Sequence, residues 1–172
     1  MKNKITPTGR ERLLREEDFI VSKTDTLGRI SYCNRKFMRI SGYAEQELLG
    51  KPHNLIRHPE MPRALFGLLW ESLKQGREFF GYVKNLCKDG GFYWVFANFT
   101  PTYDSMGELL GYYSVRRRPQ PQALEIVKPL YREMLEVERR AGARGAIQAS
   151  KTLLHETLLE RRTDYEHFIL EI

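Results

Sequence analysis

The sequence has no long apolar run and no signal for export. None of its 172 residues belong to an uninterrupted apolar stretch approaching the roughly 18 residues that a membrane-spanning helix needs. The first 15 residues are polar and charged, with neither the apolar segment nor the small-residue cleavage site of a secretory signal. We therefore expect a cytoplasmic protein without membrane insertion, whether the chain is complete or part of a larger one.

Motifs for covalent, hydrolytic or metal chemistry are also missing. The two cysteines, Cys33 and Cys87, lack the CxxC spacing of a zinc site or redox pair and do not define a disulfide framework. We expect both thiols to be buried and reduced. No Ser-His-Asp motif, metal-ligand spacing or glycine-rich phosphate loop is present. These absences favour a protein that is not an enzyme.

The charge is positive, at +6, but basic residues are mixed with acidic ones along the chain. The densest basic groups are Arg116–Arg118 and the set Arg139, Arg140 and Arg144. Neither group alternates with aromatic residues, as a platform for stacking nucleic-acid bases would. We interpret both as solvated faces and expect no nucleic-acid partner.

Composition and patterning divide the chain into three regions. Residues 1–17 form a charged N-terminal lead-in, with a helix expected at about Arg10 to Glu17. Residues 18–118 are rich in glycine, aromatics and alternating patterns, and are expected to form one folded domain. Residues 119–172 are expected to form a C-terminal helical extension.

The middle region predicts an α+β fold. Residues 19–22 and 30–33 have the pattern of a hairpin, Asn34 can cap a following helix, and a longer helix is expected over about 60–75. Three further strands, 79–87, 92–103 and 109–116, are joined by glycine-containing turns. The expected architecture is a five-stranded antiparallel sheet with helices on one face.

The C-terminal extension predicts two amphipathic helices, over about 123–140 and 150–172, separated by Gly142 and Gly145. Each carries an apolar stripe at spacings of three and four residues, and such a stripe needs a partner. The partner is either the protein's own sheet or a second subunit. We expect a homodimer formed through the sheet or the terminal helices.

The middle region contains a distinctive series of segments: Ser41-Gly42-Tyr43, Glu47-Leu48-Leu49-Gly50, Lys51-Pro52-His53-Asn54, Arg57-His58-Pro59-Glu60-Met61-Pro62, Trp70, Gly81-Tyr82-Val83-Lys84-Asn85, Lys88-Asp89-Gly90 and Tyr93-Trp94-Val95. In these segments the chain resembles the PAS domain of aerotaxis receptors, a flavin-binding redox type, and the resemblance covers about Asp18 to Arg118. It implies that residues 18–118 are a PAS sensor domain that binds FAD noncovalently. It also implies redox or oxygen signalling, as in aerotaxis and chemotaxis, through the C-terminal extension to an unknown downstream protein.

Several polar residues could serve such a cofactor. Asn85 and Asn98, on adjacent predicted strands, could pair with both donors and acceptors on the edge of a flavin ring. Arg57 could bind a phosphate, and His58 could donate to one. His53 lies in the same loop. Each of these residues has a plainer explanation as a loop or strand-end residue with a local partner.

Other candidates are aromatic or belong to helix ends. Trp70, Phe66 and Tyr93 could cover a planar ring, although the same residues could be ordinary core. Glu60 stands where aerotaxis receptors carry aspartate, so any contact that depends on side-chain length is in doubt. Asn34 could touch ligand or act only as a helix cap.

The sequence also leaves other ligands and a ligand-free role to be considered. The segment Gly50–His53 lacks the cysteine that blue-light sensors of the LOV type use to attack flavin. A haem site is poorly supported, because haem-binding PAS domains carry an axial histidine on the long helix and residues 60–75 contain none. Only His53 and His58, in the loop before that helix, could serve as ligands. The chief alternative is a ligand-free PAS interaction or dimerisation module. A small carboxylate bound by Arg57 is a third option.

Overall fold

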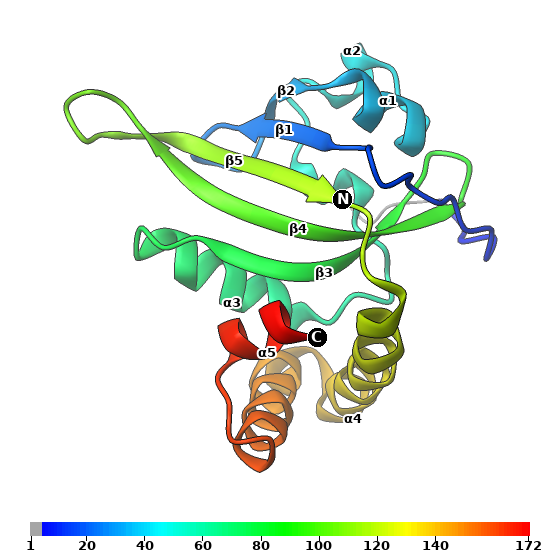
Figure 1. Cartoon of the computed structure of the whole chain (residues 1–172), viewed down its shortest axis with the longest axis vertical. Coiled ribbons are helices and arrows are strands. Elements are labelled where there is room, and N and C mark those ends of the chain that lie inside the picture. Colours follow the sequence, from blue (N-terminus) through cyan, green and yellow to red (C-terminus); the bar gives the residue numbers. More distant parts are fainter. Residues whose placement is uncertain (1–4) are drawn as a thin grey trace.

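The computed structural model describes residues 5–172 and contains one sheet with helices around it (Figure 1). Its helical and strand elements are β1 (Ile20–Thr24), β2 (Ile30–Cys33), α1 (Arg35–Ser41), α2 (Glu45–Leu48), the 3-10 helix η1 (His53–Ile56), α3 (Arg63–Lys74), β3 (Phe79–Leu86), β4 (Phe92–Tyr103), β5 (Leu109–Arg117), α4 (Pro121–Glu160) and α5 (Tyr165–Glu171).

The sheet confirms the predicted α+β fold. Its five strands are antiparallel and run in the order β2-β1-β5-β4-β3, so the first and last halves of the domain meet at the β1–β5 pair. Side chains alternate between two faces. The helices between β2 and β3 cover one of these faces, which we call the inner face. On it, α1 and α2 pack against β1 and β2, and α3 packs against β3 and β4 (Figure 1).

Local capping explains where α1 begins and ends. The Asn34 side chain accepts a hydrogen bond from the Phe37 N–H at 3.0 Å, which satisfies one of the free donors of the first turn. Gly42 ends the helix with φ of 78°, a conformation that glycine adopts without steric cost. Phe37 and Ile40 are buried in the core.

Residues 5–17 of the N-terminal lead-in contain no helix, so the helix predicted at Arg10 to Glu17 is wrong. The Thr8 N–H donates to the Gly90 carbonyl, and Arg10 and Arg12 exchange backbone hydrogen bonds with Phe92 at the start of β4. The Arg12 guanidinium also donates to the Ile40 carbonyl at 2.7 Å. Pairing with a segment some eighty residues away thus outweighs local helix propensity.

The C-terminal extension forms helices, but not with the predicted boundaries. α4 bends sharply at Gly142, whose φ of 70° and ψ of 179° are not helical, while Gly145 lies inside the second arm. The helix expected over 150–172 is interrupted after Glu160, and α5 begins only after Asp164, whose side chain accepts from the His167 N–H. The prediction of one unbroken helix there is wrong.

The two apolar stripes of the extension pack on the protein's own domain. Val127, Tyr131 and Met134 from the first arm, and Leu154, Leu158 and Phe168 from the rest, belong to the same buried cluster as the sheet. α4 lies along α3, and α5 lies beside β3 (Figure 1).

The outer edge of β3 is covered by this extension. The Tyr131 hydroxyl donates to the Tyr82 carbonyl at 2.8 Å, and the Tyr165 hydroxyl donates to the Phe80 carbonyl at 3.1 Å. An edge strand presents free backbone groups that can pair with other chains. Here two of those carbonyls are bound by tyrosines from α4 and α5.

Candidate functional site

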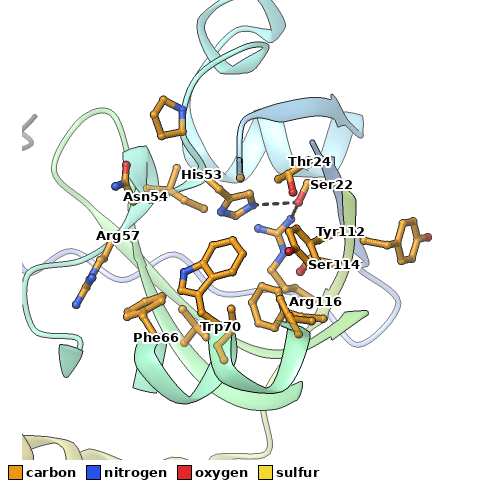
Figure 2. A pocket seen from close by; sticks show the side chains of 18 of the residues that line it. Ser22, Thr24, His53, Asn54, Arg57, Phe66, Trp70, Tyr112, Ser114 and Arg116 are labelled. Atoms are coloured by element: carbon orange, nitrogen blue, oxygen red, sulfur yellow. Dashed lines mark hydrogen bonds between the residues drawn. The ribbon is translucent and has the colours of Figure 1, made fainter. Parts of the chain in front are cut away.

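A cavity of about 220 Å³ lies between the inner face of the sheet, η1 and α3. Figure 2 shows that its walls differ in character. β1 and β5 supply polar side chains, η1 supplies a histidine, and α3 supplies mainly aromatic and aliphatic groups. Five of the ten predicted site residues line it: His53, Arg57, Phe66, Trp70 and Asn85.

The sheet wall holds polar atoms without partners. Within residues 5–172, Thr24 Oγ1, Asn85 Nδ2, Ser114 Oγ and two nitrogens of Arg116 are buried and have no hydrogen-bond partner. All four residues line the cavity. Buried polar groups are nearly always paired, since leaving one unpaired costs about 1–3 kcal/mol. The wall is therefore suited to a ligand with several acceptors and donors.

Arg116 is the most unusual member of this wall. It is 1% exposed, the largest of the fully buried side chains, so the prediction that Arg116–Arg118 form a solvated face is wrong at this position. Its guanidinium lies 4.7 Å from the centre of the Phe37 ring and donates from Nη2 to Ser22 Oγ. Burial lowers the pKa of Arg116 to about 10, which leaves it charged at neutral pH.

His53 joins the same network from the opposite side. Its Nε2 lies 3.0 Å from Ser22 Oγ (Figure 2). Arg116 donates to this hydroxyl oxygen, and the Ser22 O–H can in turn donate to His53 Nε2, an arrangement that corresponds to the tautomer with its proton on Nδ1. Burial, followed by the nearby Arg116 charge, lowers the pKa of His53 to about 3. His53 is therefore neutral at pH 7.

Trp70 lies across the mouth of the cavity. Its ring meets Tyr112 of β5 edge to face at 5.3 Å between centroids and approaches Gly28 in the turn between β1 and β2. The side chain is nevertheless 37% exposed. Trp70 thus covers the cavity but is not part of the buried core. It lines both this cavity and the space outside it.

A wider groove of about 1000 Å³ adjoins the cavity on the side of α4. Asn54, Arg57, Phe66 and Trp70 line both spaces and form their common rim. The Arg57 guanidinium lies 4.0 Å above the Phe66 ring and also donates to the Met61 carbonyl. Arg57 is therefore held at the passage between the two spaces.

His58 faces the groove rather than the cavity. It is 1% exposed, and its Nδ1 accepts from the Glu60 N–H at 3.1 Å, so the ring helps to order the loop before α3. Burial and the Lys84 charge lower its pKa to about 4.

Four further predicted residues, besides His58, lie outside the cavity wall. The side chain of Asn34 bonds Val21, Phe19 and Phe37 backbone groups. Glu60 pairs with Lys84 at 2.6 Å. Tyr93 is fully buried in the core. Asn98 pairs with Phe80 across the strands, which places it on the outer face, where it donates to Glu78.

Sequence reasoning missed part of the polar wall: Ser22, Thr24, Ser114 and Arg116. Their signal is strand alternation, because Ser22 and Thr24 share one face of β1, and Ser114 and Arg116 share one face of β5. The β1–β5 register places Ser22 opposite Ser114, so all four side chains lie on the inner face.

Metal sites and membrane-spanning helices are both absent from residues 5–172. No cluster of three or more histidine, cysteine or acidic side chains in this range is arranged to hold a metal ion. No helix in it is long and apolar enough to cross a bilayer. Cys33 and Cys87 are both buried and unpaired, as predicted.

The two depressed histidine pKa values predict a loss of stability in mild acid. In an unfolded chain both histidines titrate near pH 6.5, whereas the folded protein holds His53 and His58 neutral down to about 3 and about 4. The contribution of the two histidines to the free energy of unfolding is complete above about pH 6.5. It declines as pH falls, by up to roughly 1.4 kcal/mol per pH unit for each histidine. Urea unfolding between pH 7 and 5 measures this decline.

His53→Gln and His58→Gln should each flatten that decline. His167 is the matched control, because Asp164 raises its pKa and its contribution is lost as pH rises. His167→Gln should leave the acid-side decline intact. Equal slopes in all three variants and the parent would contradict the assignment.

Comparison with known proteins defines the class of this fold and site. Residues 30–116 match the family model described as PAS fold, and the chain belongs to that family. It is 41% identical over 121 residues to the aerotaxis receptor of Escherichia coli K12, covering 70% of this chain and 24% of the receptor. It is 30% identical over 105 residues to the nitrogen fixation regulatory protein of Klebsiella pneumoniae, covering 61% of this chain and 21% of that protein.

The chain thus spans only about a quarter of the length of these relatives. Among solved structures, a light-oxygen-voltage domain studied with a flavin analogue aligns at a TM-score of 0.57 and 22% identity. The alignment covers 67% of this chain and 87% of that one, and it supports the fold. The chain is a PAS module related to sensory receptors and regulators.

Proposed function

We propose that this PAS module binds FAD noncovalently and signals redox state or oxygen through its C-terminal helices, without turning over a substrate. The relatives named above include a receptor for aerotaxis. The observation that carries the proposal is the sheet wall with its unpaired buried groups, Thr24, Asn85, Ser114 and Arg116. A flavin ring presents alternating donors and acceptors along one edge, which this wall would satisfy.

The space supports a ring in the cavity and the rest of the cofactor beyond it. At about 220 Å³ the cavity is smaller than the roughly 300–1,000 Å³ of typical ligand pockets, so it suits only part of FAD. The groove of about 1000 Å³ begins at the shared rim. Arg57 at the rim and Arg63 in the groove would hold the phosphates, with Trp70 and Phe66 covering the ring.

FAD supplies the electron-accepting chemistry when bound. The chain's own residues hold and orient the ring and limit its contact with water. His53 stays neutral because burial and the Arg116 charge lower its pKa, so it adds no second buried charge beside the ring. The opposite wall, formed by α3, is apolar, with Leu69 and Leu73 among its residues.

Titration with FAD tests the proposal directly. We expect a yellow complex, bleached by dithionite, and a rise in the free energy of unfolding of about 2.7 kcal/mol at a hundredfold excess over Kd. Asn85→Ala should weaken binding roughly tenfold, because about 1.4 kcal/mol of hydrogen bonding is lost. Asn98→Ala is the control on the outer face and should bind normally. Failure of FAD, FMN and riboflavin to bind would reject the proposal.

The route to the C-terminal helices starts from the same strand as the cavity wall. β5 carries Ser114 and Arg116 and leads directly into α4. α4 returns to the site, where buried Glu138 accepts from the Ala64 N–H at the start of α3, at 3.2 Å. Negative charge is favourable at a helix N-terminus. The extension is thus attached to two elements that line the cavity.

We expect hydrogen exchange in α4 and α5 to differ between the oxidised and reduced FAD complexes. The measurement is exchange mass spectrometry on both states of one preparation. Protection in α2, which packs against β2 and does not line the cavity, is the internal control. Identical protection of α4 and α5 in both states would reject signalling through the extension.

The ligand-free alternative would have an absent or apolar-filled cavity, and the unpaired polar wall favours a ligand instead. Binding of a small carboxylate at Arg57 would compete with its place at the rim over Phe66. A homodimer, a cytoplasmic location and a downstream signalling protein remain predictions. Sedimentation of the FAD complex over a range of concentrations tests the first of these.

A further inference from the structure

A buried cation without a counter-charge stands in the wall of the cavity. Arg116 pairs with Ile20 of β1 and Ala97 of β4, so it projects from the middle of the sheet onto the inner face. Within residues 5–172 the only hydrogen bond of its side chain is to the Ser22 hydroxyl, and Nε and Nη1 have none. No carboxylate in that range contributes to its environment.

The groups around Arg116 are neutral at pH 7. His53, on η1, has its pKa lowered by burial and by Arg116 itself. Tyr93, on β4, is fully buried, and burial raises its pKa. Ser22 from β1 and the Phe37 ring from α1 complete the surroundings. A buried charge of this kind is costly unless an opposite charge or several acceptors meet it.

We propose that Arg116 selects the reduced, negatively charged form of the flavin ring. This inference rests on the proposed function. Reduction adds two electrons from an external donor and one proton from solvent, and leaves one negative charge delocalised along the edge that carries the ring's carbonyl groups. Arg116 meets that charge with its unpaired N–H groups, so no second proton is taken up there.

The same arrangement explains the neutral state of His53. With His53 uncharged, the single positive charge of Arg116 faces the ring. The flavin that has gained two electrons and one proton carries one negative charge, which balances that of Arg116. Oxidised flavin offers Arg116 only carbonyl and ring-nitrogen acceptors. The protein therefore binds the reduced form more tightly than the oxidised form, and by linkage its flavin is more easily reduced than flavin in water.

The test compares dissociation constants for FAD before and after reduction with dithionite, under anaerobic conditions. For the parent protein we expect the reduced form to bind at least tenfold more tightly. In Arg116→Met, which keeps the length of the side chain, this ratio should fall to near one. Arg116→Lys keeps the charge and should retain most of it. An unchanged ratio in Arg116→Met overturns the inference while leaving FAD binding intact.

Two further measurements do not depend on the ratio. The flavin-free Arg116→Met protein should be at least as stable to urea as the parent, because an unpaired buried charge has been replaced by an apolar group. In the parent, the midpoint potential should change between pH 6 and 8 with the slope of one proton for two electrons. A two-proton slope overturns the inference. If neither form of FAD binds the parent, both this inference and the proposed function fail.

Discussion

Replacing Tyr131 with alanine is expected to cost about 3–5 kcal/mol in the free energy of unfolding. Tyr131 is 3% exposed and belongs to the cluster shared by the sheet and the C-terminal helices. Its ring lies 6.1 Å from the Trp94 ring, and its hydroxyl donates to the Tyr82 carbonyl. The substitution removes both contacts and leaves a cavity. Urea unfolding followed by tryptophan fluorescence measures the loss.

Tyr131→Phe separates the two contributions. It keeps the ring and leaves the Tyr82 carbonyl without its donor, which should cost about 1–3 kcal/mol. Arg132→Ala, one residue along and exposed, should have little effect. If Tyr131→Ala unfolds the extension alone while the sheet keeps its stability, the two do not form one cooperative unit.

Replacing Gly111 with alanine is expected to have the largest effect of any single added methyl group, about 4 kcal/mol or more. A Cβ at this position would meet the Thr24 carbonyl oxygen at 1.9 Å, and the residue has φ of 152°. Thr24 belongs to β1, and its carbonyl cannot move without separating β1 from β5. Separating β1 from β5 would also displace Thr24 and Ser114, which line the cavity, so FAD binding should weaken as well.

Gly107 provides the control for backbone conformation. Its φ is 84°, but nothing lies within 4 Å of the position that a methyl group would take. Gly107→Ala should therefore cost only the strain of a left-handed residue, about 1–2 kcal/mol. Thermal unfolding of both variants measures the difference. Equal losses would show that the close approach at Thr24 is unimportant.

The fold was predictable because its signals are local. Asn34 and Gly42 bound α1 by capping, and Lys88-Asp89-Gly90-Gly91 forms the turn between β3 and β4. The predictions that were wrong concern segments whose structure depends on contacts with residues distant in the sequence. Arg10 to Glu17 became extended because Phe92 offers backbone partners, which no property of that segment reveals.

The site was predicted only in part for a related reason. Arg116, Arg117 and Arg118 look alike in the sequence, yet the first is buried on the inner face of β5 and the other two are exposed. Asn85 and Asn98 look equally suited to a flavin edge, but the β3–β4 register places them on opposite faces. Residue type indicated the chemistry, whereas only the register decided which side chains reach the cavity.

The tyrosine hydroxyls on the edge of β3 have a consequence for self-association. If signalling moves α4 and α5 away, the carbonyls of Phe80 and Tyr82 lose their donors together. A strand uncovered in this way can pair with the same strand of a second copy. The activated form would then associate through a strand edge that the resting form keeps covered, and this association would depend on protein concentration.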